Sequence, residues 1–519
     1  MSPTHGVDHA PEHAAPEAQT RRDLSVALRN ALKLGGSLLA TWAVGLVVSF
    51  AVPRQLGPQH FGILYYAESF TGAVFVVTGL GIDTYIQKSV SIRPRHASDF
   101  FGTVLAIRAL LSALVLVGML VYERAGNDTV ETIAAVMMYG LTQVLVTMNA
   151  SLSALLQSAT KVGRLAISNV VSKILWGGGV LFALRMHAPV WLVILPLFAT
   201  ELLKSFAVFV VVRREIDLRL TFDLSATWAV LREAWPFFVN TAAFTVGSML
   251  DGAMMKRLAS PEDLGFYGGA KRIAAVALLL SPLVSWVLMP LLTRARARSD
   301  DEFFAVLRRA IEAVLVGAIP ATMLLAIGAD VWIRLLYGTA QNPGAYDPAI
   351  MTLRVLAPSF VLTYAAVLLA TALILFDRAW PVTLVSIGSL VIQPFLILLM
   401  VPYGGRHFGA GGAGLGNAMV FSFLELFSVV GFACYLGRRA VDRRCVLAVA
   451  GSLAAFASAA VLDAFIRDLG PARLLVDTIL YAGVVFATRA VRVSDVRTVI
   501  QLFLERRRER AAAKAAEGA

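Results

Sequence analysis

Long apolar runs recur along the chain from Leu32 to Tyr481, and short polar segments separate them. Runs of roughly 20 residues fit transmembrane helices, whereas the strands of a membrane barrel are about 10 residues long and alternate apolar with polar positions. Hydrocarbon offers no water to the backbone, so each helical segment must satisfy its own amides. We therefore expect an all-α membrane protein with about 14 transmembrane helices. The expected spans are residues 32–52, 62–86, 101–122, 132–156, 165–184, 189–212, 233–255, 264–291, 310–330, 350–375, 380–402, 409–436, 446–465 and 471–488.

The composition agrees with this pattern, because 58% of the 519 residues are hydrophobic, 15% are charged and the mean hydropathy is +0.73. A soluble domain carries about 25% charged residues. The sequence shows no nucleotide-binding loop, no legible Ser-His-Asp set and no metal-ligand spacing within the spans. Cys434 and Cys445 give no framework for disulfides or zinc. We expect no catalytic site, no cofactor and no metal, which argues against a soluble enzyme.

Basic residues gather on one side of the expected membrane. If the N-terminus is cytoplasmic, 31 of the 46 Lys and Arg residues lie in cytoplasmic segments and 9 lie in outer connections. Cytoplasmic loops of membrane proteins carry such an excess, so the bias predicts that both termini are cytoplasmic. The net charge of +12 then faces anionic membrane lipids and requires no nucleic-acid partner. We expect a disordered tail over residues 1–30 and a basic amphipathic tail over residues 491–519.

A short motif occurs twice at matching places in the chain. The pattern Arg-x-x-x-Pro-x-x-x-Gly begins at Arg54 after the first expected span and at Arg257 after the seventh, an offset of 203 residues. The two units begin an even number of spans apart, so a pseudo-twofold axis along the membrane normal would relate them. We expect two six-helix lobes, at residues 31–228 and 229–440, and two additional helices in residues 441–490. A common turn into a helix is the alternative interpretation of the motif.

Ionisable residues inside the expected spans are costly, by about 2.5–3.5 kcal/mol each on insertion scales, and those that remain usually face a cavity or a partner. More of them are basic than acidic, and a wet cavity with such an excess would attract a polyanion such as a pyrophosphate. An acidic side chain there could instead carry a coupling proton or sodium ion. The candidate substrate-binding residues are Arg108, Lys173, Lys204, Lys271, Arg272 and Arg354, and the candidate ion-coupling residues are Asp83, Asp251, Glu201 and Glu425.

Three of these residues, Arg108, Lys173 and Arg354, have no obvious partner on their own helices, which makes them the strongest candidates for a cavity. Each of the others has a structural alternative. These alternatives are neutralisation of Glu201 by Lys204 on one helix, extension of Lys271 and Arg272 to the membrane interface, and pairing of Asp83 with Lys88 and of Asp251 with Lys256.

Several segments resemble one protein family in their order and position. The stretch Val-Pro-Arg-Gln-Leu-Gly-Pro-Gln-His-Phe-Gly-Ile-Leu from Val52 resembles the pattern Arg-x-Leu-Gly-x-x-x-Phe-Gly of polysaccharide flippases of the multidrug/oligosaccharidyl-lipid/polysaccharide exporter superfamily. The stretch from Leu264 to Arg272 is similar to that family's Leu-Gly-x-Tyr-x-x-Ala-x-Arg pattern. Further matches are Gly79 to Lys88, Pro236, Asn240, Asp251, Leu335 to Gly338, Tyr346 to Ala349 and the small-residue run from Gly409. Together they cover nearly the whole chain.

The resemblance implies a flippase that moves a polyprenyl-pyrophosphate-linked oligosaccharide from the cytoplasmic to the periplasmic leaflet by alternating access, for surface polysaccharide biosynthesis. It implies a bacterial inner membrane location and a lipid-linked oligosaccharide substrate. We expect a monomer, with a polysaccharide polymerase or assembly proteins as candidate partners. Two alternatives stay open, a multidrug or cation antiporter of the same superfamily and a non-transporting membrane scaffold of a polysaccharide assembly complex. The basic excess in the spans disfavours the antiporter.

Overall fold

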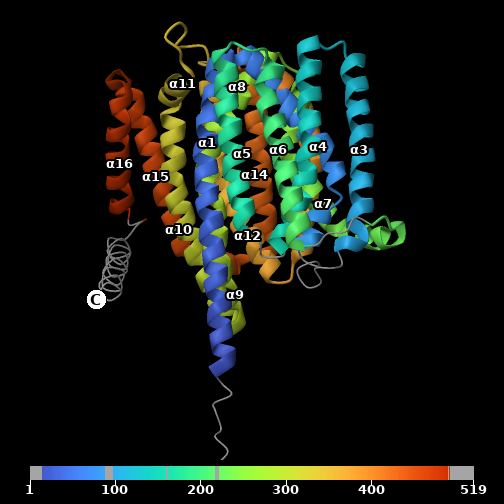
Figure 1. The fold of residues 1–519 in the computed structure, drawn as a ribbon. Coiled ribbons are helices and arrows are strands. Elements are labelled where there is room, and N and C mark those ends of the chain that lie inside the picture. The colour runs from blue at the N-terminus through green and yellow to red at the C-terminus, as the bar shows by residue number, and fades with distance from the viewer. Residues whose placement is uncertain (1–13, 88–96, 159–161, 217–220, 489, 491–519) are drawn as a thin grey trace, which may run out of the picture. The chain divides into compact units, whose positions relative to one another are not determined.

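The computed structural model of the chain describes residues 14–87, 97–158, 162–216, 221–488 and 490. These residues form helices joined by short turns, and no strand occurs among them (Figure 1). The all-α class predicted from the apolar runs is confirmed. The predicted C-terminal tail lies outside the described residues, as do residues 1–13 of the predicted N-terminal tail. Helix α1 begins at Ala14, so the remainder of that tail is helical.

Eleven helical stretches of the described chain are long and apolar enough to cross a membrane, which makes this a multi-pass membrane protein. The first of them, Thr41–Gly79, covers most of the first two expected spans, because helical structure continues through the turn between them. The expected spans 233–255 and 264–291 fall on helices but are not among the eleven. A 3₁₀ turn, η4 (Ala275–Leu280), interrupts the second of these. The predicted count of about 14 spans is therefore not confirmed.

The chain divides into two compact units. Unit 1 comprises residues up to Ser49 together with Val74–Ala242. In it α4 packs against α2, α3, α5 and α6, and buried side chains such as Phe100, Leu155 and Val212 form the core between them. Its elements are the start of α1 (Ala14–Phe75), η1 (Val76–Gly79), α2 (Ile82–Tyr85), α3 (Ala97–Ala125), α4 (Val130–Ser158), α5 (Val162–Arg185), α6 (Val190–Ile216) and most of α7 (Leu224–Met255).

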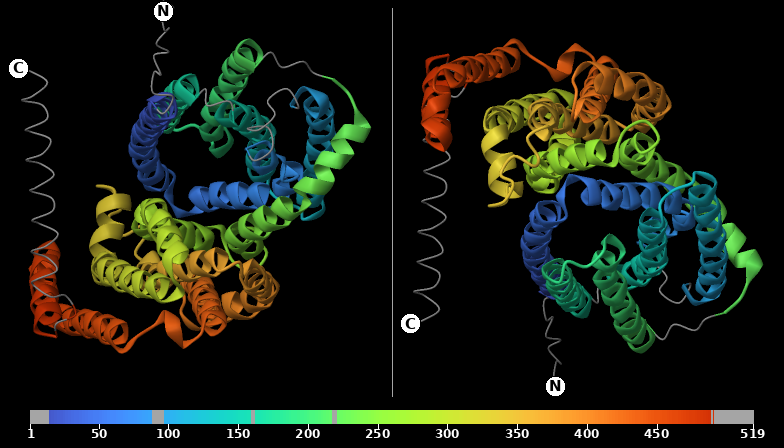
Figure 2. Two further views of the ribbon diagram at one scale, coloured as in Figure 1. Left: turned by 90° about the horizontal axis from the view of Figure 1, so that it is seen from below. Right: turned by 90° about the horizontal axis from the view of Figure 1, so that it is seen from above.

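Unit 2 comprises Phe50–Ala73 and the residues from Ala243 onward. In it α12 packs against α8, α10 and α14, while α15 and α16 lie beside α10 at one edge of the unit (Figures 1 and 2). The predicted boundary between lobes at residues 228 and 229 stays a prediction. The further elements are α8 (Pro261–Ala274), α9 (Ser281–Arg298), α10 (Asp300–Ile327), α11 (Ala329–Tyr337), α12 (Ala349–Leu375), α13 (Ala379–His407), α14 (Gly412–Leu436), η5 (Arg438–Ala440), α15 (Arg443–Phe465), η6 (Arg467–Ala472) and α16 (Arg473–Ala487).

The two copies of the repeated motif pack against each other within unit 2. A methyl group added at Gly62 would overlap the carbonyl oxygen of Pro261, and one added at Gly265 would overlap the carbonyl oxygen of Pro58. The contact is reciprocal, as a twofold relation between the copies predicts. Each glycine therefore permits a close approach of two backbones that a side chain would prevent.

A sharp turn precedes the helical segment in each copy. Gly57 interrupts α1 with φ 72° and ψ 171°, a conformation that favours glycine, and Pro58 then opens the next helical segment. In the second copy the Ser260 side chain accepts a hydrogen bond from the Asp263 amide at 3.1 Å, and Pro261 occupies the first helical position. Local sequence thus encodes both turns.

Candidate functional site

The expected site residues fall into both units, and most of the basic ones lie beside an acidic side chain of the same unit. Arg108, Lys173 and Lys204 lie in unit 1, whereas Lys271, Arg272 and Arg354 lie in unit 2. Five ion pairs involve these residues, and the partner usually comes from another helix. Their role in binding substrate stays a prediction.

Arg108 on α3 is enclosed in unit 1, with 1% of its surface exposed. Its guanidinium donates to the Gly79 carbonyl oxygen at 2.5 Å, to the Thr147 carbonyl oxygen at 3.0 Å and to the Ser151 hydroxyl. It also pairs with the Asp83 carboxylate at 3.2 Å. The break between η1 and α2 frees the Gly79 carbonyl, and hydrocarbon would leave such a group without a partner. Arg108 therefore stabilises a broken helix in this conformation rather than facing an open cavity.

Replacing Arg108 with lysine should destabilise the protein by about 1–3 kcal/mol, because a buried acceptor then loses its donor. Lysine keeps the charge but lacks the planar fork that reaches several acceptors at once. The measurement is the midpoint of thermal unfolding in detergent. Exposed Arg185 on α5 provides the matched control, and Arg185→Lys should leave the midpoint unchanged. Equal midpoints for the two variants would contradict the bridging role of Arg108.

The other candidates of unit 1 lie on α5 and α6. Lys204 and Glu201 pair at 3.7 Å, as their spacing on one helix allows, and the Asn149 amide donates to the Glu201 carboxylate at 2.7 Å. The Lys173 ammonium lies 3.6 Å from the centre of the Trp176 ring, a cation–π contact between neighbouring turns. Polar partners such as Asn149 and Ser151 were missed by the sequence analysis, because uncharged residues carry no signal against the apolar background.

A cavity of about 320 Å³ opens between α4, α5 and α6 of unit 1. Two basic side chains and no acidic one line it, and the rest of its wall is largely apolar. Such a lining suits a molecule with an anionic group and a hydrocarbon portion. The lining residues are Leu156, Arg164, Leu165, Ile167, Ser168, Val171, Ser172, Leu175, Leu203, Lys204, Ala207, Val208 and Val211.

In unit 2, Asp251 on α7 is the centre of a buried polar cluster. Its carboxylate accepts hydrogen bonds from the Lys271 ammonium and, at 2.6 Å, from the Tyr267 hydroxyl. Lys271 also donates to the Ser248 carbonyl oxygen at 3.1 Å. The alternative pairing of Asp251 with Lys256 is not the one observed, since the Lys256 ammonium lies over an aromatic ring.

Arg272 pairs with Glu68, a residue that the sequence analysis missed. The two side chains approach to 2.9 Å, and the Arg272 guanidinium lies 4.7 Å from the centre of the Phe61 ring. The repeat offers a signal that could have found Glu68, because the offset of 203 residues aligns it with Lys271. The remaining acidic candidate, Glu425 on α14, is partly buried, and no ion pair reaches it within the described chain.

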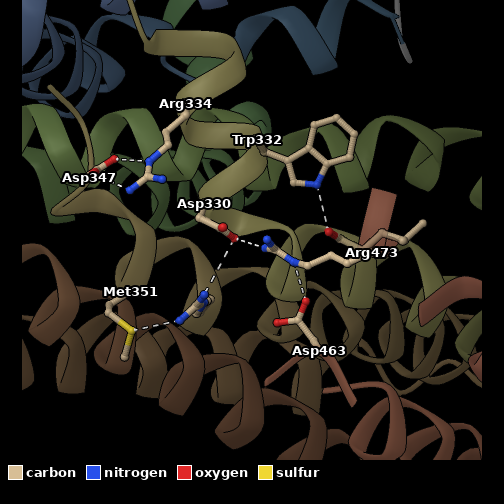
Figure 3. A network of polar contacts seen from close by, with 9 residues as sticks. Asp330, Trp332, Arg334, Asp347, Met351, Asp463 and Arg473 are labelled. Atoms are coloured by element: carbon tan, nitrogen blue, oxygen red, sulfur yellow. Dashed lines mark hydrogen bonds and ion pairs between the residues drawn. The ribbon is translucent and has the colours of Figure 1, made fainter. Parts of the chain in front are cut away.

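Arg354 belongs to a network at the ends of α10 to α12 and of α15 and α16 (Figure 3). Its guanidinium lies 3.9 Å from the Asp330 carboxylate, which also accepts from Arg473 at 2.5 Å. Arg473 donates in addition to the Asp463 carboxylate at 2.6 Å. Although burial opposes the charged form, the Arg473 guanidinium holds the pKa of the Asp330 carboxyl below its usual value. Except for Arg354, the sequence analysis missed this network, although Asp463 lies inside the thirteenth expected span and could have pointed to it.

Comparison with known proteins agrees with this fold. A model of the polysaccharide biosynthesis protein family matches residues 27–296. The probable low-salt glycan biosynthesis flippase Agl15 of Haloferax volcanii is 21% identical over 393 residues, which cover 71% of this chain and 75% of that protein.

Two solved structures share the fold at low sequence identity. The lipid II flippase MurJ in an inward closed conformation superposes with a TM-score of 0.68 at 13% identity, covering 89% of this chain and 99% of that one. An inward-facing multidrug resistance MATE family transporter of the MOP superfamily superposes with a TM-score of 0.58 at 13% identity, covering 76% and 93%. The chain therefore shares the fold of these two membrane proteins.

Proposed function

The chain belongs to the polysaccharide biosynthesis protein family, and from this premise we propose that it is a flippase for polyprenyl-pyrophosphate-linked oligosaccharide. It moves this substrate from the cytoplasmic to the periplasmic leaflet of the bacterial inner membrane, by alternating access of the two expected lobes. Both termini are cytoplasmic, and transport involves no enzymatic step. The likeness to the glycan flippase of Haloferax volcanii and to the MurJ fold supports the proposal.

The observation that carries the proposal is the cavity in unit 1. Lys204 and Arg164 supply positive charge, and arginine in particular donates two parallel hydrogen bonds to phosphate. Apolar side chains around them, such as Leu203 and Val208, favour a hydrocarbon chain. A lipid-linked pyrophosphate combines both chemistries in one molecule. An organic cation would meet repulsion from Arg164, whereas the charge of Lys204 is partly balanced by Glu201.

Replacing Lys204 or Arg164 with glutamine should lower transport of the lipid-linked glycan. A hydrogen bond to a charged group contributes about 1.5–3 kcal/mol, which corresponds to about tenfold or more in affinity. The measurement is translocation of a fluorescent polyprenyl-pyrophosphate glycan in vesicles containing the purified protein. Arg185→Gln, at the opposite end of α5 from Arg164, is the matched control and should transport at the rate of the unaltered protein. Unchanged transport in both Lys204→Gln and Arg164→Gln would reject this cavity as the binding site.

Deletion of the gene tests the function itself. We expect surface polysaccharide to be lost and lipid-linked precursor to accumulate on the cytoplasmic leaflet. Unchanged glycan export would reject the flippase assignment, and a gain in sensitivity to cationic drugs with normal export would favour an antiporter. Loss of polysaccharide in cells, combined with no translocation in vesicles, would favour a scaffold.

A further inference from the structure

The facing sides of α15 and α16 carry polar groups that the proposed transport function does not use. On α16 the buried residues Arg473, Asp477, Tyr481 and Val485 recur every fourth position and therefore share one face. The small residues Ser452, Ala455 and Ala459 of α15 lie in the same buried seam, and Asp463 lies near its end. Polar side chains buried between two membrane helices are costly, and those that are present usually pair with one another or serve a function.

Arg473 accounts for part of this polar face. It donates to Asp463 at 2.6 Å and to Asp330 at 2.5 Å, and Arg473 and Asp463 are each about 5% exposed (Figure 3). Asp330 continues the network to Arg354 on α12. These contacts join the two additional helices to α11 and α12 of the same unit.

Asp477 remains without a donor. Its side chain is fully buried, and neither carboxylate oxygen has a hydrogen-bond partner among the described residues. It lies one helical turn from Arg473 on the same buried face of α16, and the N–H groups of Arg473 are directed to Asp463 and Asp330. The Asp463 carboxyl is therefore a near neighbour of Asp477. Two carboxylates can hydrogen-bond to each other only when one of them holds a proton, since an ionised carboxylate only accepts.

The charges of the network do not cancel without that proton. Three carboxylates, those of Asp330, Asp463 and Asp477, face the guanidiniums of Arg473 and Arg354. The one other titratable side chain of the buried α16 face is Tyr481. Arg467 and Asp468 of η6 are exposed, and the face of α10 that packs on this seam consists of Ile319, Met323 and Ile327. An uncompensated buried charge is costly, and one proton on these carboxylates removes it.

We infer that Asp463 and Asp477 form a proton-binding site between α15 and α16 that holds one shared proton in the folded protein. A sodium ion fits less well, because a hard cation needs several oxygen ligands and no three acidic, His or Cys side chains of the described residues are placed to hold one ion. Release of the proton leaves a second negative charge beside Arg473 and weakens the hold of this residue on Asp330. The site thus sets the strength of the link between α16 and α11. It does not depend on the proposed function.

Infrared difference spectroscopy of the full chain in lipid nanodiscs tests this site. A neutral carboxylic acid has a C=O stretching band that an ionised carboxylate lacks. We expect the spectrum of the unaltered protein minus that of Asp477→Asn to show this band at neutral pH and to lose it at alkaline pH. The spectrum of Asp463→Asn should also lack this band, because Asp477 then faces Arg473 without a second carboxylate beside it and is ionised. The matched control is Asp468→Asn, an exposed carboxylate of the same connection, which should keep the band.

Thermal unfolding provides a second readout. A site that holds a proton in the folded chain and not in the unfolded chain makes stability fall as pH rises. We expect Asp477→Asn and Asp463→Asn to remove this slope and Asp468→Asn to keep it. The inference is overturned if the difference band is absent, or if both buried variants keep the slope. A band that vanishes when sodium is added at constant pH would instead show a sodium site.

Discussion

When Gly62 is replaced with alanine, we expect most of the protein molecules to fail to fold. The added methyl group would overlap the Pro261 carbonyl oxygen, which belongs to backbone and cannot rotate away. Overpacking of a core usually costs about 1–3 kcal/mol, and a clash with backbone should exceed this range. The measurement is the fraction of monodisperse protein after detergent extraction, together with its unfolding midpoint.

The reciprocal contact makes this prediction specific. Gly265→Ala should be as damaging as Gly62→Ala, because its methyl group would overlap the Pro58 carbonyl oxygen. Gly118→Ala on α3 is the matched control, since a methyl group there meets no atom within 4 Å. That variant should be neutral or gain up to about 1 kcal/mol from the higher helix propensity of alanine. Normal yield of Gly62→Ala would contradict the packing of the two repeat copies.

Replacing Asp251 with asparagine should cost about 2–3 kcal/mol, because it leaves the Lys271 ammonium without its counter-ion in a partly buried position. Asparagine keeps an acceptor for the Tyr267 hydroxyl, so the loss reports the charge. The free energy of unfolding follows from denaturant titration in mixed micelles. An exposed ion pair serves as control, that of Arg334 and Asp347, and Asp347→Asn should cost less than about 1 kcal/mol.

A double variant separates the buried charge from the shape of the site. Adding Lys271→Met to Asp251→Asn removes both charges and retains the length of the side chain. Replacing a buried pair by an apolar residue is often neutral or stabilising, so most of the lost stability should return. If the double variant is less stable than Asp251→Asn, the stability of this cluster does not depend on pairing of the two charges.

The sequence identified many of the residues with ionisable side chains inside the expected spans, but it missed Glu68 and most of the pairings. It matched Glu201 with Lys204 because they share one helix, and it could not match Arg108 with Asp83 or Arg272 with Glu68, which come from different helices. Hydrogen bonds to backbone, such as that from Arg108 to Gly79, depend on where a helix breaks. The periodicity of apolar residues in the sequence does not predict where a helix breaks.

The sequence by itself determined the helical membrane class and the presence of a repeated turn, because run length and local turn chemistry follow from neighbouring residues along the chain. Only the tertiary structure decided that the two turns pack against each other, that Arg354 joins Asp330, and that Asp477 faces Asp463 without a donor. Those contacts join residues far apart in the chain, and their energies depend on which helix faces lie together. Their strength depends on how deeply each is buried, and burial is a property of the folded arrangement.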